Sequence, residues 1–528
     1  MYKLLFSLSM LVFVQSFSQQ KNLSWEEISK EYTFPKWYTE ARFGIWVHWG
    51  AQSQPDSGGG WYARHMYMQD VGREDWGKNA YSYQVRHYGH PSEAGFKEVI
   101  NSWKADKLNT DELVKYFKSI GAKYFVALAN HHDHFDNFAS TYHAWNSVNV
   151  GPKKDLIGLF SRSASKYGLP FGVSSHDDRF LNWWLPAFGA DTSGPEKGIA
   201  YDGNLTKVDG KGKWWDGLDP ADLYGLPPAK RTPEYIESVK KNYVQRTEEL
   251  VSKYDVDFLW FDGYGFPYGN YGKEVCTYFL NNDLKKHGKF TAVIAGKFQE
   301  NEPAIAEDIE RGGATKIENF VWQGTLTFND WFHKTERPLR HNARTMIESL
   351  TDIISKNGNL LLNVELYPDG RIPADQKLIL DSIGRWINKN AEAIYATKAW
   401  KVYGDNIGGH KETNDISNAD LEAAEKQQQS HDFNERTIAA PPYPHDEVRF
   451  TTKGNYLYVF VLNPEGGEIE ILVLALGGKY DVKKITSITL LGSKSKVNFK
   501  QDKNRLLLSV PPVYTRQNTL VYKLTGAL

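Results

Sequence analysis

Between about residues 37 and 400, short apolar runs alternate with amphipathic segments. Six of these runs are almost continuously hydrophobic, which is typical of strands covered on both faces of a parallel sheet. Polar and charged residues follow directly after the runs, where barrel enzymes carry their chemistry. The pattern therefore favours a (β/α)₈-like (TIM) barrel, although an open doubly wound α/β sheet has the same periodicity. The predicted strands are residues 43–47, 124–129, 171–174, 258–261, 291–295 and 360–364.

Start signals mark three of the helices predicted between or after these strands. Thr110 is the expected N-cap of a helix that carries Leu113 and Phe117 on one face. Thr232 precedes a proline and a glutamate, the usual residues of a helix start. Pro373 is expected to begin a third helix.

The pattern changes towards the C-terminus. Short apolar runs separated by Gly, Asn, Asp and Lys turns, without helix periodicity, predict an antiparallel β-sandwich. A chain of 528 residues also exceeds what one hydrophobic core usually organises. The predicted organisation is a signal peptide at 1–19, a catalytic barrel at 20–405, a linker or excursion at 406–444 and the β-sandwich at 445–528.

The first residues predict export. Lys3 precedes the apolar run 4–14, and the small residues Ser16 and Ser18 flank a cleavage site. We therefore expect a periplasmic or extracellular protein. No other stretch is long and apolar enough to span a membrane. Cys276 is the only cysteine, so it forms no internal disulfide, and we expect it buried in a helix.

Composition narrows the partners. Lys+Arg 63 against Asp+Glu 64 give a net charge of -1, which does not indicate nucleic acid or an anionic membrane surface. Aromatic residues make up 14% of the chain, with 17 Trp and 30 Tyr. A cleft that stacks sugar rings and a large aromatic core explain this content equally well. The oligomeric state stays open.

Asp262 is the strongest candidate for a catalytic residue. It follows an apolar strand directly and precedes Gly263, so its carboxylate would project into a barrel mouth. A carboxylate there can attack an anomeric carbon and form a glycosyl ester. The alternative is an aspartate that caps the next loop.

Histidines gather after the strands. His48 ends the first strand, His176 follows the third, and residues 131–136 hold three histidines and two aspartates. They are compatible with a metal site, with hydrogen bonds to sugar hydroxyls, or with ordinary loops. Because adjacent His131 and His132 point in different directions, they do not easily share one ion. We predict no metal and no cofactor.

A retaining glycosidase needs a second carboxyl group about 5 Å from the first, as acid and base. The candidates lie in residues 300–310, particularly in the predicted acidic loop at 307–312. The alternative is a solvated acidic loop without chemistry.

Taken together, these motifs resemble the α-L-fucosidases of glycoside hydrolase family 29. The resemblance covers nearly the whole mature chain, and the order and spacing of the motifs make it specific. It is carried by residues 42–50, 61–62, 131–133, 260–263, 359–364, 383–386, 390–395 and 448–454.

The resemblance implies a retaining mechanism with Asp262 as nucleophile. In this family the acid/base varies in position, and here Glu310 is our choice, with Glu307 and Asp308 in reserve. The partner would be a fucosylated or L-galactose-containing glycan from which a terminal sugar is removed. We expect the sugar to be bound by His48, Trp49, Trp61, Tyr62, His131, His132, His176, Trp260 and Trp322.

Several departures from the family pattern bear on the substrate. Asn130 and His134 stand where the family often has Lys and Gly, His176 lies where a Tyr-Tyr-Ser pattern is common, and Gln323 replaces a frequent Glu. These changes lie at strand ends, so they would reshape the pocket around the C5 substituent or the leaving group. Terminal α-L-galactose therefore stays open beside α-L-fucose.

An inserted segment at 182–225, rich in Trp, would either form aglycone subsites or pack on the barrel rim. Two other functions compete with a glycosidase. One is a non-catalytic carbohydrate-binding protein on the same barrel. The other is a metal-dependent hydrolase that uses His131, His132 and His134.

Overall fold

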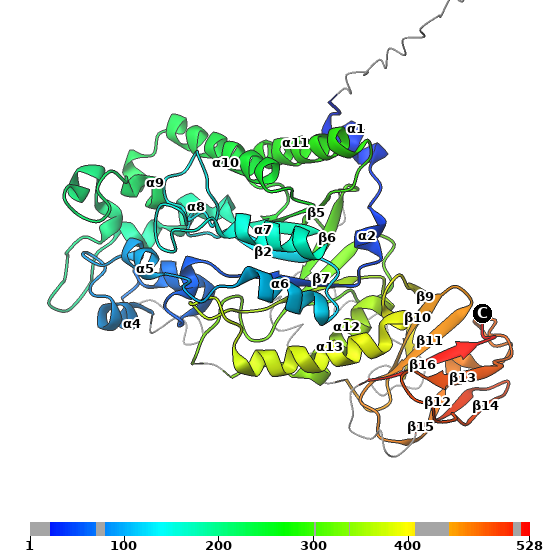
Figure 1. Cartoon of the computed structure of the whole chain (residues 1–528). Helices are drawn as coiled ribbons and strands as arrows, with labels where there is room; N and C mark the ends of the chain where they lie inside the picture. Colours follow the sequence, from blue (N-terminus) through cyan, green and yellow to red (C-terminus); the bar gives the residue numbers. More distant parts are fainter. Residues whose placement is uncertain (1–21, 70–79, 300–301, 337, 407–442, 511–518) are drawn as a thin grey trace, which may run out of the picture.

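The structure is a computed structural model that describes residues 22–69, 80–299, 302–336, 338–406, 443–510 and 519–528. The predicted signal peptide and nearly all of the predicted linker lie outside these residues. Figure 1 shows a large α/β domain on the left and a smaller β domain at the lower right. Among the described residues, no helix is long and apolar enough to cross a membrane.

The large domain is a closed barrel of eight parallel strands, which confirms the predicted fold class. Each strand pairs with its neighbours in chain order, and β8 closes the barrel on β1. Six strands match the predicted runs, while β6 and β7 were not predicted. The strands are β1 (Phe43–Val47), β2 (Phe125–Asn130), β3 (Phe171–Ser175), β4 (Phe258–Tyr264), β5 (Val293–Lys297), β6 (Ile305–Glu310), β7 (Trp322–Thr327) and β8 (Asn359–Asn363).

The predicted acidic loop at 307–312 is wrong, because its first four residues belong to β6. This strand escaped the sequence analysis because it reads Ile-Ala-Glu-Asp-Ile-Glu, with carboxylates where buried strands carry apolar residues. β7 likewise contains Gln and Thr. No helix is described between β5 and β6 or between β6 and β7, so the usual alternation of strand and helix is also lost there.

Helices cover the rest of the barrel (Figure 1). The N-cap of α6 is Asn109 rather than Thr110, since the Asn109 side chain accepts the Glu112 N–H. Thr232 caps α10 as predicted. The helices are α1 (Trp25–Glu31), α2 (Lys36–Thr39), α3 (Tyr62–His65), α4 (Ala80–His87), α5 (Phe96–Ser102), α6 (Thr110–Ser119), α7 (Leu156–Tyr167), α8 (Phe180–Trp183), α9 (Pro220–Tyr224), α10 (Pro233–Lys253), α11 (Asn270–His287), α12 (Ala343–Ser355) and α13 (Ala374–Ile394).

Alternation along the strands decides which side chains enter the barrel. Trp260, Ala295 and Ala306 belong to the cluster that fills its interior. Every second residue of a strand faces the same side, so Asp262 and Lys297 follow two of these inward positions into the mouth. On β6, Asp308 and Glu310 face inward for the same reason.

The smaller domain consists of two antiparallel sheets, in the strand orders β13-β16-β11-β10-β9 and β12-β15-β14. Residues 398–405 were predicted to belong to the barrel domain, but they form β9 and pair with β10. The strands are β9 (Lys398–Asp405), β10 (Val448–Lys453), β11 (Tyr456–Val461), β12 (Gly467–Ile471), β13 (Ser487–Leu490), β14 (Phe499–Gln501), β15 (Leu506–Val510) and β16 (Leu520–Thr525).

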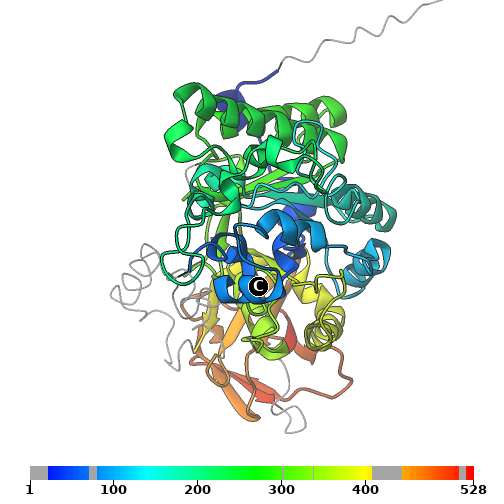
Figure 2. The ribbon, with the colours of Figure 1, turned by 90° about the vertical axis from the view of Figure 1, so that its left-hand side faces the viewer.

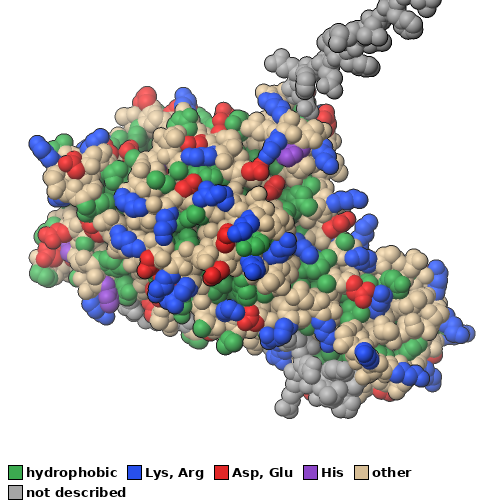
Figure 3. All heavy atoms as spheres, in the orientation of Figure 1, with side chains coloured by type: hydrophobic (Ala, Val, Ile, Leu, Met, Phe, Trp, Pro, Cys, Tyr) green, Lys and Arg blue, Asp and Glu red, His purple; other side chains and the backbone are tan. Residues whose placement is uncertain are grey.

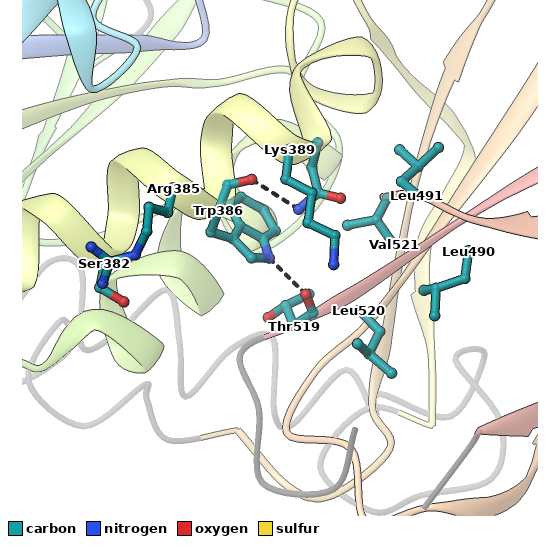
Figure 4. A pocket seen from close by; sticks show the side chains of 10 residues that line it. Ser382, Arg385, Trp386, Lys389, Leu490, Leu491, Thr519, Leu520 and Val521 are labelled. Carbon is teal, nitrogen blue, oxygen red and sulfur yellow. Dashed lines mark hydrogen bonds between the residues drawn. The ribbon is translucent and has the colours of Figure 1, made fainter. Parts of the chain in front are cut away.

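The two domains are joined through α12 and α13. Figure 4 shows Trp386 of α13 beside the β domain, where its indole N–H donates to the Thr519 carbonyl at 2.6 Å. Deeper in the interface, the buried Arg449 of β10 contacts Asp352 of α12 at 2.7 Å and Glu447 at 2.6 Å. A buried cation between two carboxylates makes this contact specific.

The segments that follow β1 and β3 gather at the end of the barrel opposite the β domain, and Figure 2 looks onto that end. Because parallel strands all end on one face, this is where the polar strand ends meet. Charges of both signs are interspersed over the face shown in Figure 3, in keeping with the net charge of -1.

Replacing the buried interdomain cation should destabilise the fold. We expect Arg449→Met to lower the free energy of unfolding by about 3–5 kcal/mol, because two buried carboxylates lose a partner. Urea denaturation followed by fluorescence measures the change. Arg505→Met is the control, since it removes an exposed Arg505–Glu470 ion pair and should leave the midpoint almost unchanged. Equal midpoints for both variants would contradict the interface role.

Candidate active site

Two carboxylates share one ammonium group at the mouth of the barrel. Lys297 Nζ lies 2.9 Å from Asp262 Oδ1 and 2.6 Å from Glu310 Oε2. The two carboxylate oxygens are therefore separated by no more than the sum of these contacts, about 5.5 Å. Retaining glycosidases hold their two carboxyl groups about 5–5.5 Å apart, whereas inverting enzymes need roughly 6.5–9.5 Å. The geometry fits covalent attack by one group.

Asp262 is held as a carboxylate. Its Oδ2 lies 3.2 Å from His132 Nε2 and 3.5 Å from His176 Nδ1. Burial opposes ionisation, but the ammonium of Lys297 and the hydrogen bonds from both imidazoles outweigh it and hold the pKa of Asp262 well below its usual range. An ionised carboxylate at this point is ready to act as a nucleophile.

The glycine after Asp262 is required by the backbone. Gly263 has a φ of 83°, in the left-handed region, and a Cβ there would lie 2.4 Å from Asp178 Oδ2. Glycine thus lets the Asp178 carboxyl approach the end of β4. Burial, together with the charge of Asp262, raises the pKa of Asp178 to about 6.

Glu310 receives a second contact from an aromatic residue. The Trp331 indole N–H donates to Glu310 Oε1 at 3.2 Å. Burial raises the pKa of Glu310, the ammonium of Lys297 lowers it, and the charge of Asp262 raises it; the net shift is downward. The group that is to donate a proton is thus paired with a cation in the free enzyme.

Four histidines surround the space in front of Asp262. The ring centroids of His48 and His176 are 4.7 Å apart, and those of His131 and His176 are 4.9 Å apart. Burial lowers the pKa of His48 and His131 well below the usual range and that of His176 to about 4. These three rings are therefore neutral near pH 7.

The histidine nitrogens offer hydrogen bonds to a ligand. Gln52 Nε2 lies 2.8 Å from His131 Nδ1, so the amide donates and the neutral ring carries its proton on Nε2. Both ring nitrogens of His48 and Nε2 of His176 are buried without a hydrogen-bond partner among the described residues. Buried polar atoms of this kind are normally satisfied, so they fit a ligand rich in hydroxyl groups.

Two groups in the described residues bring ligand atoms within 4.8 Å of one another: His48, His131 and His176, and His132, His176 and Asp262. The first group includes an N–H donor on His131, and the ammonium of Lys297 contacts the carboxylate of the second. A neutral hydroxylated ligand suits both better than a cation.

His134 lies outside this cluster. Its Nδ1 is 2.6 Å from Asp177, and Arg246 lies between Asp136 and Asp177. His134 has a φ of 61°, a conformation that favours glycine, and stacks on Phe180 with ring centroids 3.5 Å apart. The structure therefore does not group His131, His132 and His134, and this buried network instead fixes the loop after β2.

Aromatic rings line the rest of the site. Trp46 lies 4.7 Å from Trp260 and 5.3 Å from Trp331, measured between ring centroids. On the opposite side, Trp61 packs 4.7 Å from Trp183 of the inserted segment, which lies 4.8 Å from His132. The insertion thus reaches the site through Trp183.

Three of the expected sugar-binding residues are not in the cluster. Trp49 donates to the Tyr367 carbonyl and packs on Trp103, and the Tyr62 hydroxyl donates to Gln84. Trp322 is fully buried and donates to the Lys356 carbonyl, because it faces outward on β7. These three residues therefore support the site from the core.

The two alternative acid/base candidates, Glu307 and Asp308, make other contacts. Glu307 faces outward and accepts the Phe298 N–H at 2.9 Å. Asp308 lies deeper in the barrel, where Gln323 donates to it at 2.8 Å and burial raises its pKa to about 7. Glu310 is the member of the three that reaches Lys297.

Sequence reasoning missed Lys297. The predicted strand ended at residue 295, whereas β5 continues to Lys297. The only indication in the sequence was the alternation of side-chain direction, which places residue 297 on the same inward face of the strand as Ala295. Trp183 was covered only as part of the Trp-rich insertion at 182–225, and Trp331 was not among the predicted site residues.

Comparison with known proteins identifies relatives of this architecture. A family model described as α-L-fucosidase matches residues 10–392. A tissue α-L-fucosidase of Bos taurus is 27% identical over 384 residues, which cover 70% of each chain. An α-L-fucosidase of Dictyostelium discoideum is 22% identical over 395 residues, 73% of this chain and 76% of the relative.

Solved structures agree with these relatives. A structure named α-L-fucosidase has 25% identity and a TM-score of 0.68, covering 95% of this chain and 99% of its own. An α-L-fucosynthase of Thermotoga maritima, solved with α-L-Fuc-(1-2)-β-L-Fuc-N3, has 25% identity and a TM-score of 0.66 with the same coverage.

Two tryptophans of the inserted segment provide a matched test of the pocket wall. We expect Trp183→Ala to weaken binding of L-fucose by about three- to tenfold, because stacked aromatic contacts contribute roughly 0.5–1.5 kcal/mol. Trp214 is 41% exposed and donates to Glu98, so Trp214→Ala should leave the affinity unchanged. Isothermal titration calorimetry measures both. Equal affinities in the two variants would place Trp183 outside the binding site.

Proposed function

The chain belongs to the α-L-fucosidase family of glycoside hydrolases, and from this premise we propose that Asp262 and Glu310 carry out its retaining hydrolysis of terminal α-L-fucosides. The observation that supports these roles is the pair of carboxylates held by one ammonium group, with their contacting oxygens no more than about 5.5 Å apart, which is below the range of inverting enzymes.

The reaction has two displacements. Asp262 attacks C1 while Glu310 gives its proton to the glycosidic oxygen, so a glycosyl ester forms and the aglycone leaves. Glu310 then takes a proton from water, the water oxygen bonds to C1, and the ester bond to Asp262 breaks. Two inversions at C1 leave the sugar with its original configuration.

The histidines and tryptophans of the site support recognition of the sugar. His131 presents an N–H, and His48 and His176 present buried nitrogens without protein partners, which suits hydroxyl groups. The partly exposed indole rings of Trp61 and Trp331 suit the apolar side of a sugar ring. A non-catalytic carbohydrate-binding protein would need the aromatic surface but not the paired carboxylates.

We propose that the same site also accepts terminal α-L-galactosides. L-Galactose differs from L-fucose by a 6-hydroxyl, and a purely apolar pocket discriminates poorly against an added hydroxyl. His176 Nε2 is buried without a hydrogen-bond partner among the described residues, and the His176 ring packs 5.9 Å from Trp46 and 4.7 Å from Trp260, measured between ring centroids. A hydroxyl bound there would satisfy this nitrogen.

Removal of each carboxyl tests the assignment. We expect Asp262→Ala to lower kcat/KM for 4-nitrophenyl α-L-fucoside by at least about 10⁴-fold, because no covalent intermediate forms. Glu310→Ala should lower it by about 10²–10⁴-fold, because the leaving oxygen lacks its proton donor. Asp255→Ala, which removes an exposed carboxylate in the segment between α10 and β4, is the control and should retain activity.

Azide separates the two roles. It should rescue Asp262→Ala with the inverted β-L-fucosyl azide and Glu310→Ala with the retained α-L-fucosyl azide, distinguished by NMR. If both variants gave the same anomer, or if neither lost activity, the assignment would be wrong.

The sugar preference depends on His176 in this proposal. We expect His176→Phe to lower the ratio of kcat/KM for the α-L-galactoside to kcat/KM for the α-L-fucoside by at least about tenfold, because the 6-hydroxyl loses its partner in a buried pocket. The two nitrophenyl glycosides measure this ratio in one preparation, so any general loss of activity cancels. An unchanged ratio would show that His176 does not contact the C5 substituent.

A further inference from the structure

Among the residues that the structure describes, Lys297 is the cationic group that contacts both carboxylates. It stands at the C-terminal end of β5, between Asp262 on β4 and Glu310 on β6, and its side chain is 10% exposed. Its Nζ also lies 5.7 Å from the centre of the Trp260 ring. The ammonium is therefore fixed by two carboxylates and the face of an indole.

A cation at this position offsets the repulsion between the two carboxylates that the double displacement requires. Two carboxylates whose oxygens contact the same ammonium in a partly buried mouth repel each other, and without that cation the ionisation of one would oppose the ionisation of the other. Burial lowers the pKa of Lys297, but the charges of Asp262 and Glu310 outweigh it and raise the pKa, which keeps the group protonated. Its contact with both groups does not depend on a bound sugar.

We propose that Lys297 is a positioning residue that serves as the counter-ion of whichever carboxylate is ionised at each stage of the reaction. This role rests on the proposed function of Asp262 and Glu310. It assigns to Lys297 the two tasks of holding both carboxyls at the retaining separation and of following the negative charge from one to the other.

The charges balance at every stage. In the complex ready to react, Asp262 is a carboxylate and Glu310 carries a proton, so Lys297 neutralises Asp262. After the first displacement, the electron pair of Asp262 forms the ester bond and the aglycone has taken the proton of Glu310, so Lys297 neutralises Glu310. In the second displacement Glu310 regains a proton from water, and the released Asp262 carboxylate pairs with Lys297 again.

The ammonium moves little during this cycle, since it already lies within 2.9 Å of an oxygen on each side. In the glycosyl ester, Asp262 has lost its charge and no longer raises the pKa of Glu310, while Lys297 still lowers it. Glu310 is thereby favoured as a carboxylate at the stage where it must act as a base.

Other titratable and charged groups face the same carboxylates, and they are unchanged in the test below. Asp178 lies at the start of the segment after β3, and Asp308 lies below Glu310. Among the described residues, these groups are His48, His131, His132, His176, Asp178, Tyr264, Asp308 and Arg311.

The pH dependence of kcat/KM tests the proposal. Lys297 favours the ionised form of both carboxyls, so its removal should raise the pKa of each. In Lys297→Met, both the acidic limb, which reports Asp262, and the basic limb, which reports Glu310, should move to higher pH by about one unit or more. The substrate is 4-nitrophenyl α-L-fucoside, and circular dichroism establishes that the variant is folded.

Two further variants separate this role from a merely structural one. Lys297→Arg keeps the charge and should restore limbs close to those of the wild type. Lys286→Met removes an exposed lysine on α11 and should not move them. A structural defect would lower the rate at all pH values without shifting either limb.

The outcomes distinguish the two proposals. If the wild type is active, Asp262→Ala is inactive and the limbs of folded Lys297→Met coincide with those of the wild type, the role of Lys297 is refuted alone. If the wild type hydrolyses neither the α-L-fucoside nor the α-L-galactoside, the proposed function fails and the role of Lys297 fails with it.

Discussion

The chemistry of this molecule depends on keeping two like charges close together where little water can screen them. Asp262 and Glu310 approach within reach of one nitrogen because three consecutive strands, β4, β5 and β6, each end with an inward side chain. In the closed parallel barrel all strands end on the same face, which brings these side chains together. The imidazoles of His132 and His176 add hydrogen bonds to the other carboxylate oxygen of Asp262. The buried Arg246 network, in turn, fixes the loop that carries His132.

Much of this arrangement was predictable from alternation and from residue types at strand ends. Asp262 was found because its strand is apolar and a glycine follows it, and His48, His131 and His176 were found because they end or follow similar strands. The barrel was favoured for the same reason. The β domain was visible because its turns are regular and its strands lack helix periodicity.

The features that were not predicted, β6 and the placement of several aromatic residues, depend on contacts that a pattern of apolar residues does not reveal. β6 places carboxylates inside the barrel, so its burial is achieved through Lys297 and Gln323 rather than through apolar side chains. Trp49, Tyr62 and Trp322 were expected in the pocket, but each lies on the outward or core side of its segment. Motif strength alone does not tell whether an aromatic residue contacts the ligand or supports one that does.

The absence of a described crossover helix on either side of β6 has a consequence for how such enzymes diverge. Among the described residues no helix joins the strand that carries Glu310 to its neighbours, and loop connections accept insertions and deletions more readily than a packed helix does. The nucleophile strand β4, by contrast, lies between α10 and α11 and is constrained at both ends. Evolution can therefore relocate the proton donor from one homologue to another while the attacking carboxylate stays in place.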